Sequence, residues 1–327
     1  MGSREGNVRE SPHLEAAAAC CARWCSRKLA LKLAAAWTAL ALAGCGVSDP
    51  PYVRPDPALL SLVPADTVLL AGARLDHIQE TSFYDQHLRG RSMPFVDGWI
   101  TGAGVDPTSE IWELLAAYNG REVVVMARGK FSDMGLEPRI QREGASKTSY
   151  KGYAITGDDE MAVMFVNPSA LVTGPPQLLR SILDNRGRAS PPAGLLAKLE
   201  EVGRENQLWA VSLGGFSGDG LAGGRRMSEL AGIFGKLRGF RAAAALGEGL
   251  SLQVEGDCAN GREAESLQSA LRILLAVARG KVKEQAAMAA LYDAVRVSRQ
   301  EAKVRIEAEM PPELVDALIG GLEPPAE

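Results

Sequence analysis

The chain reads Pro175-Pro176-Gln177-Leu178-Leu179-Arg180-Ser181-Ile182-Leu183 over 175–183, and a matching pattern, Pro311-Pro312-Glu313-Leu314-Val315-Asp316-Ala317-Leu318-Ile319, returns 136 residues later. In both stretches a pair of prolines comes before apolar residues at helical spacing. Proline is well placed in the first turn of a helix, because its missing N–H would have no partner there. We therefore predict a helix in each stretch. Because duplicated units must bury matching faces, the repeat also predicts the architecture.

Further segments of the two halves match in the same order. Each predicted helix follows a hairpin, formed by 153–156 and 161–166 in the first half and by 294–298 and 302–308 in the second. Upstream, the strand candidate at 67–71 corresponds to the one at 208–212, and the candidate at 122–127 corresponds to the one at 250–256. We expect an α+β fold of two tandem related units of antiparallel strands, with helices packed on one face. Chance similarity between short apolar strands is the alternative.

The predicted domain limits follow from this pairing and from a leader at the N-terminus. They are a signal peptide at 1–44, a proline-rich tether at 45–62, a first α+β unit at 63–187, a connecting segment at 188–206, a second α+β unit at 207–322 and a tail at 323–327. Other helices are expected at 77–89, 109–118, 195–205, 226–237, 262–279 and 282–292. Within 262–279, a helical spacing predicts that four apolar residues face the core: Leu267, Leu271, Leu274 and Val277.

A short apolar run near the N-terminus indicates export. Basic residues at 27, 28 and 32 precede the run at 33–43, which has about half of the ~20 residues that a helix needs to cross a bilayer. Leu42-Ala43-Gly44-Cys45 follows and resembles the lipobox of bacterial lipoproteins. The resemblance implies cleavage after Gly44 and attachment of a diacylglyceryl group to the Cys45 thiol, which would make the membrane a partner of the protein. Ordinary cleavage after Ala43, which would release a free protein, is the alternative.

The residues after Cys45 extend this interpretation. Gly46 stands where an Asp would mark inner-membrane retention in the enteric lipoproteins, so the resemblance implies the outer membrane and its periplasmic side. Four prolines between 46 and 57 predict a stiff tether. The opening Val63-Pro64-Ala65-Asp66 is similar to that of uncharacterised exported bacterial domains, a likeness that brings no function with it.

Charge and cysteine usage exclude two classes of protein. The whole chain has a net charge of -4, and from Cys45 onward it holds 30 basic and 37 acidic residues. A net negative surface repels phosphate backbones, so we expect no nucleic-acid partner. Four of the five cysteines lie at or before Cys45, so Cys258 cannot form an internal disulfide and is expected to be a buried apolar residue.

Candidate chemical motifs fail on spacing. His77 and His87 are the only histidines beyond the leader, and they match no ligand motif, so we expect solvated or capping side chains. Ser217 cannot belong to a nucleophile elbow, because Asp219 occupies the place of the last glycine and no histidine follows. The run Gly218–Gly223 has the Gly-x-Gly-x-x-Gly form of a dinucleotide loop, but residues 214–217 separate it from the preceding strand, which favours a surface loop.

The sequence thus predicts no catalytic residue, no cofactor and no metal site. We expect a non-enzymatic, lipid-anchored module of the cell envelope that binds or scaffolds an envelope protein or ligand, through the cleft or sheet surface between its two units. One alternative is an envelope enzyme that uses carboxylates at Asp158, Asp159 or Glu160, although a solvated hairpin turn is favoured there. The other alternative is dinucleotide binding through Gly218–Gly223.

Overall fold

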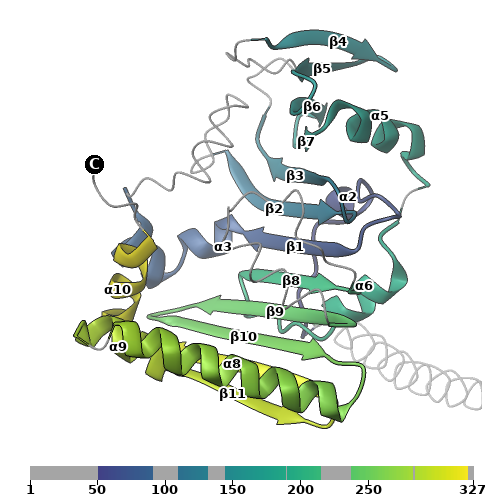
Figure 1. Ribbon diagram of the computed structural model, residues 1–327. Helices are drawn as coiled ribbons and strands as arrows, with labels where there is room; N and C mark the ends of the chain where they lie inside the picture. Colours follow the sequence, from purple (N-terminus) through teal and green to yellow (C-terminus); the bar gives the residue numbers. More distant parts are fainter. Residues whose placement is uncertain are drawn as a thin grey trace, which may run out of the picture. The chain divides into compact units, whose positions relative to one another are not determined.

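One antiparallel sheet of twelve strands organises the described part of the chain (Figure 1). The computed structural model describes residues 51–90, 110–131, 144–188, 190–214, 237–282 and 284–322. The strands are β1 (Leu69–Arg74), β2 (Ile111–Tyr118), β3 (Val123–Gly129), β4 (Ser146–Tyr150), β5 (Tyr153–Gly157), β6 (Ala162–Asn167), β7 (Ala170–Gly174), β8 (Leu208–Ser212), β9 (Gly239–Leu246), β10 (Leu250–Asp257), β11 (Val295–Gln300) and β12 (Lys303–Met310). The helices are α2 (Pro57–Leu60), α3 (Leu75–Gln79), the π-helix η1 (Tyr84–Leu88), α5 (Pro176–Asn185), α6 (Ala193–Leu199), α8 (Gly261–Lys281), α9 (Ala286–Asp293) and α10 (Pro312–Leu322).

The strand order runs β11-β12-β10-β9-β8-β1-β2-β3-β7-β6-β5-β4. In the middle, β1 and β8 pair antiparallel, with Leu70 opposite Val211. Every pairing along the sheet is antiparallel, including the hairpins β6–β7 and β11–β12 that precede α5 and α10. The expected α+β class with antiparallel strands is therefore confirmed.

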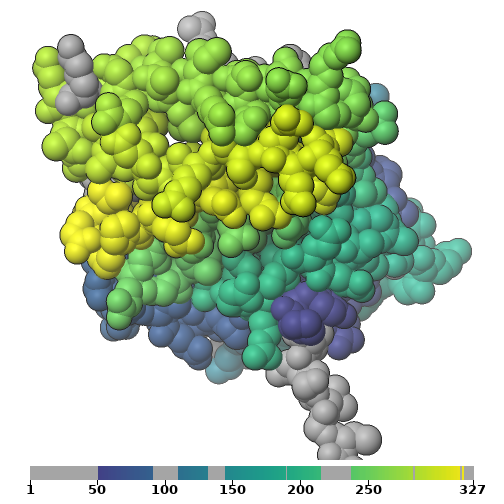
Figure 2. All heavy atoms as spheres, turned by 90° about the horizontal axis from the view of Figure 1, so that it is seen from below, coloured from purple at the N-terminus to yellow at the C-terminus, as the bar shows by residue number. Residues whose placement is uncertain are grey.

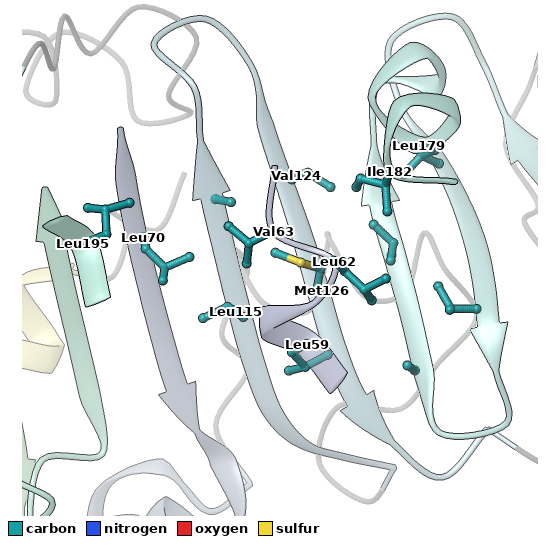
Figure 3. Close-up of a cluster of buried hydrophobic side chains, with 14 of the residues drawn as sticks. Leu59, Leu62, Val63, Leu70, Leu115, Val124, Met126, Leu179, Ile182 and Leu195 are labelled. Atoms are coloured by element: carbon teal, nitrogen blue, oxygen red, sulfur yellow. The ribbon is translucent and has the colours of Figure 1, made fainter. Parts of the chain in front are cut away.

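The largest core cluster lies on the face of the sheet that α5 covers (Figure 3). From the strands it takes Leu70, Leu115 and Met126, and from α5 it takes Leu179 and Ile182. The helices α2 and α6 add Leu59 and Leu195 to the same cluster, and all of these side chains are at most 4% exposed. We call this side the α5 face.

The opposite side of the sheet carries the long helix α8, and we call it the α8 face. Leu69 precedes Leu70 in β1 but packs in a separate cluster with Phe240, Val304 and the α8 residues Ala264 and Leu267. Successive side chains of a strand point to opposite faces, so helices cover both sides of the sheet. The expectation that helices pack on one face is wrong, because α5 contributes to the core cluster on one face of the sheet and α8 to the cluster on the other.

The segment predicted as the end of the tether belongs to the folded unit. Residues 50–327 group as one compact unit, and Val53 is 1% exposed. The Val53 N–H donates to Val202 O at 2.8 Å, and Leu59 and Leu62 lie in the core. The predicted limit of 45–62 is therefore too long at its C-terminal end. The predicted connecting segment at 188–206 likewise contains α6, whose Leu199 is buried.

One predicted helix is a strand. Residues 109–118 were expected to be helical, but Ile111–Tyr118 forms β2 between β1 and β3. Its Leu and Ala residues favour a helix locally, yet pairing with two neighbouring strands overrides this weak preference. The helix expected at 77–89 is divided into α3 and η1, and the helix expected at 282–292 begins later, at Ala286. The helix predicted at 226–237 lies almost wholly outside the described residues.

The hairpin of the first half is also shifted by one strand. The predicted pair, 153–156 with 161–166, exists as β5–β6. The strand β7 lies between it and α5, however, so the hairpin that leads into α5 is β6–β7. The five residues of β7, Ala-Leu-Val-Thr-Gly, follow β6 after only two turn residues. In the sequence they therefore do not stand apart from β6 as a second strand.

Candidate functional site

The clearest candidate site is the outer surface of α8. Three large apolar side chains point to solvent there: Ile273 is 64% exposed, Leu274 is 52% exposed and Val277 is 53% exposed. With Ala270, which is also exposed, they follow the spacing i, i+3, i+4 and i+7 and so form one row along the helix. We call these four residues the apolar stripe. In Figure 2, α8 lies at the surface beside the yellow C-terminal segment.

The inner side of α8 fixes this orientation. The Asn260 side chain caps the helix by accepting hydrogen bonds from the N–H groups of Arg262 and Glu263, at 3.1 and 3.0 Å. Ala264 is fully buried, and Leu267 and Leu271 pack against the same cluster of the sheet. The prediction that Leu274 and Val277 also face the core is wrong, because the sheet covers only one side of a helix that is apolar on two.

A shallow hollow of about 480 Å³ lies on the other flank of α8, between this helix and the edge strand β11, and none of the stripe residues lines it. Apolar side chains such as Leu275 and Val297 line it, together with Arg272, Arg279 and Arg296. Arg272 Nη2 donates to Val297 O at 2.9 Å, and Arg279 forms a two-pronged ion pair with Asp293 that includes a contact of 2.8 Å. Among the residues that the structure describes, Arg296 has no ion-pair partner.

Local charge at this surface is opposite to that of the chain as a whole. Between 270 and 282 the sequence holds three basic residues and no acidic one. The basic residues are Arg272, Arg279 and Lys281, and Arg296 adds a fourth positive charge from β11. The helix α8 thus carries an exposed apolar row on one flank and a basic hollow on the other, in a chain of net negative charge.

The predicted carboxylate cluster forms a hairpin turn. Asp158 Oδ1 accepts hydrogen bonds from the N–H groups of Glu160 and Met161, at 3.0 and 2.8 Å. Asp159 and Glu160 are exposed in the turn that joins β5 to β6. None of the three lines the hollow beside α8 or a smaller one of about 290 Å³ between Leu62 and α5. Their arrangement is that of a solvated turn.

Glu113 is an ionisable group that the sequence did not single out. It lies in β2, and both of its carboxylate oxygens accept the Asp56 N–H at 3.2 Å. Asp56 in turn bonds Arg128 Nε at 2.9 Å. Burial raises the pKa of Glu113 to about 7, against the lowering effect of the Asp56 N–H. Glu113 lines neither hollow, so the structure offers it no substrate site there.

The histidines and the cysteine have structural surroundings. His77 is exposed beside Arg74, as expected. His87 is 4% exposed and its Nδ1 lies 2.9 Å from Asp316 Oδ1, so the expectation of a solvated or capping side chain is wrong for it. Cys258 is buried as predicted, and burial raises the pKa of its thiol, which disfavours the reactive thiolate.

Several predicted features lie outside the described residues, namely Gly44, Cys45 and the glycine run Gly218–Gly223. Within the described ranges, no group of three or more His, Cys, Asp or Glu side chains could hold a metal ion. None of the helices described has both the length and the apolar character needed to cross a bilayer.

Comparisons with known proteins give little to add. No protein-family model matches the chain, and no curated protein matches it either. Solved structures of the protein TP0453 resemble it in crystal forms I, III and IV, with TM-scores of 0.46, 0.49 and 0.44 and sequence identities of 11%, 10% and 10%. The matches cover 84%, 82% and 81% of this chain and 100%, 99% and 97% of the other. A likeness of this degree carries no functional argument, so no property of TP0453 is transferred.

Proposed function

We propose that this protein is a lipid-anchored, non-enzymatic binding module of the bacterial cell envelope, and that α8 is its binding surface. The observation that carries the proposal is the apolar stripe, whose three large side chains are each more than half exposed. Burying such side chains is favourable by about 1.5–3 kcal/mol each when it is complete. A contiguous exposed row of this kind marks an interaction site more often than an isolated exposed leucine does.

The anchor in this proposal is a lipid on Cys45, attached after cleavage behind Gly44, on the periplasmic side of the outer membrane. Support comes from the lipobox-like residues and the short apolar run before them. A Cys45→Ala chain should leave the membrane fraction, and intact-mass measurement of the wild-type protein should find an added lipid at the N-terminus. Unchanged fractionation together with an unmodified N-terminus would refute the anchor.

The binding surface can be tested separately with a thiol at the stripe. In a Val277→Cys chain the new thiol is exposed, whereas Cys258 is buried. We expect a membrane-impermeant maleimide, admitted to the periplasm, to label position 277 at least fivefold more slowly in cells than in the purified protein. A Ser149→Cys chain, altered on the exposed strand β4, is the matched control and should label equally in both. If position 277 labels as fast in cells as in the purified protein, the proposal that α8 is covered is refuted.

We further propose that the two halves are related copies of one unit. Outward from the central β1–β8 pair, the strands of one half are ordered β1-β2-β3-β7-β6 and those of the other half β8-β9-β10-β12-β11. In both halves three strands lie side by side in chain order, followed by a hairpin whose second strand is the inner one. The helices α5 and α10 follow equivalent strands but cover opposite faces of the sheet. An experimental structure in which these five strands fail to superpose in order would contradict the relationship.

A further inference from the structure

We propose that the occupant of the α8 surface is a second copy of this chain, whose own α8 packs antiparallel against the apolar stripe about a twofold axis. The inference rests on the proposed function, because it names the partner of the same binding surface. In Figure 1, α8 lies in front of the sheet, and no described element covers its outer side. All four stripe residues are exposed, so a second helix can reach them.

Two charged residues of opposite sign mark the ends of the stripe. Glu263 lies seven residues before Ala270, and Lys281 lies seven residues after Leu274. Seven residues make about two helical turns, so both charged residues lie on the flank of α8 that carries the stripe. Both are exposed. The stripe thus has an acidic side chain at its N-terminal end and a basic side chain at its C-terminal end.

These positions are arranged symmetrically along the helix. Glu263 and Lys281 are equally far from position 272 in the sequence, and the same is true of the two stripe residues between them, Ala270 and Leu274. When a second α8 runs antiparallel about a twofold axis at this level, its Lys281 lies opposite Glu263. In the same register, Leu274 of the second copy lies opposite Ala270, whose small side chain leaves room for it. One arrangement therefore satisfies the charged ends and the apolar middle together.

Charge selects the antiparallel orientation. A parallel pair would place Glu263 beside its own copy and Lys281 beside its own copy, so like charges would repel at both ends. In the antiparallel pair opposite charges meet at both ends, and the two helix dipoles are also favourably opposed. Glu263 accepts hydrogen bonds of 3.3 Å from the Ala259 N–H and the Asn260 side chain, which leave its charge in place. Lys281 forms no ion pair with any residue that the structure describes.

The size of the site predicts a weak pair. A single row of four side chains buries less than the ~800 Å² per partner of a standard interface, and exposed ion pairs add little. We therefore expect a dissociation constant on the order of 100 μM. A lipid on Cys45 would confine the copies to one membrane surface, where their effective concentration is high enough for pairing. In a dilute solution the purified protein should be monomeric, which leaves position 277 open to labelling there.

Sedimentation equilibrium of the chain without its leader, residues 46–327, tests the inference, because neither the apolar leader nor a lipid on Cys45 can then contribute. This chain contains every residue that the structure describes. We expect it to be monomeric at about 10 μM and largely dimeric at about 500 μM. The triple change Ile273→Gln, Leu274→Gln and Val277→Gln should raise the dissociation constant at least about tenfold. Leu213→Gln, which removes a leucine that is 39% exposed at the end of β8, should leave it unchanged.

Charge reversal tests the orientation. Glu263→Lys or Lys281→Glu places like charges together at both ends of an antiparallel pair, so each variant alone should dimerise at least about fivefold less tightly than the parent. An equal mixture of the two variants has opposite charges at both ends again and should pair as tightly as the parent. Glu200→Lys, at an exposed position after α6, is the matched control and should not change the dissociation constant. Circular dichroism and the unfolding midpoint of each variant show that it is folded.

The outcomes distinguish the inference from the proposed function. If position 277 is protected in cells but the 46–327 chain stays monomeric at about 500 μM, the second copy is overturned and α8 remains a binding surface for a different partner. If the chain pairs through the stripe but Cys45 bears no lipid, the anchor fails and the inference stands. A triple variant that dimerises as tightly as the parent, or a mixture that pairs no better than its separate variants, would also overturn the inference.

Discussion

Glu113 is a carboxyl group whose surroundings favour its neutral form. Burial is the largest cause that raises its pKa, from 4.5 to about 7, and the charges of Asp56 and Asp76 add to it. The folded protein therefore holds this proton more tightly than the unfolded chain does. The contribution of this proton to the stability of the folded protein is fully present below pH 4.5 and is lost as the pH rises through 7. The total loss of stability is at most about 3 kcal/mol.

Replacing Glu113 should expose this dependence. A Glu113→Gln chain keeps an oxygen that can accept the Asp56 N–H but has no charge to bury. We expect it to be more stable than wild type at pH 8, by about 1–3 kcal/mol, and close to wild type at pH 5. Urea unfolding at both pH values measures this, with the exposed Glu200→Gln as control. A Glu113→Gln chain that is less stable than wild type at pH 8 would contradict the assignment.

Glu255, which lies on the α5 face of the sheet, has a pKa that is shifted in the opposite direction. Burial raises its pKa, but hydrogen bonds from Lys303 and Arg305 and the charge of Arg241 outweigh burial and lower the pKa to about 2. Its contribution to stability is present above pH 4.5 and is lost as the pH falls toward 2. We expect Glu255→Gln to lose about 2 kcal/mol at pH 7, a loss that shrinks steadily between pH 4.5 and 2. A loss that did not vary with pH would count against the ion-pair network.

At the scale of the element, the two sides of α8 should contribute differently to the free energy of unfolding. Leu271 packs against the sheet and Leu274 points to solvent. We expect Leu271→Ala to destabilise the 46–327 chain by about 2 kcal/mol, and Leu274→Ala to change its stability by no more than about 0.5 kcal/mol. Thermal unfolding of the two variants in parallel measures the difference. Equal losses would mean that both leucines belong to the core.

The N-terminal cap of α8 gives a second measure of the same helix. Asn260 is the residue whose side chain accepts from the first free N–H groups. Its replacement in an Asn260→Ala chain should lower stability by about 1 kcal/mol, whereas Asn260→Asp should preserve most of it. Hydrogen exchange should then become faster in the first turn of α8 and remain unchanged in β10.

The elements also show where sequence reasoning succeeds and where it fails. Alternation in 250–256 and helical spacing in 262–279 predicted β10 and α8, because in each case one side is buried against the rest of the fold. β2 was missed because its Leu and Ala residues favour a helix locally, and only its pairing with β1 and β3 makes it a strand. The stripe was missed for a related reason: spacing shows that Leu274 is on an apolar side of the helix, but only the packed sheet decides which side is covered.

At the scale of the whole molecule, the two halves meet at the β1–β8 pair. Gly72 lies opposite Trp209 there, and a Cβ added to Gly72 would come within 2.3 Å of the indole ring. Trp209 is 5% exposed within the main core, so the ring has little room to move. We expect Gly72→Ala to destabilise the protein by about 1–3 kcal/mol, whereas Gly247→Ala, where a Cβ would meet open space, should have little effect. Unfolding midpoints of the two variants give the comparison.

The burial of Val53 limits how far the protein can stand from its attachment point. Because the chain is already fixed to the folded unit at Val53 and at Pro51, whose carbonyl accepts from Arg204, only Gly46 to Pro50 can act as a leash behind an acylated Cys45. A fully stretched leash of that length reaches roughly 20 Å. If Cys45 is acylated as proposed, a module held so closely would work on its own leaflet and would not bridge to a distant membrane, and lengthening the leash by insertion after Pro50 would relax this restraint.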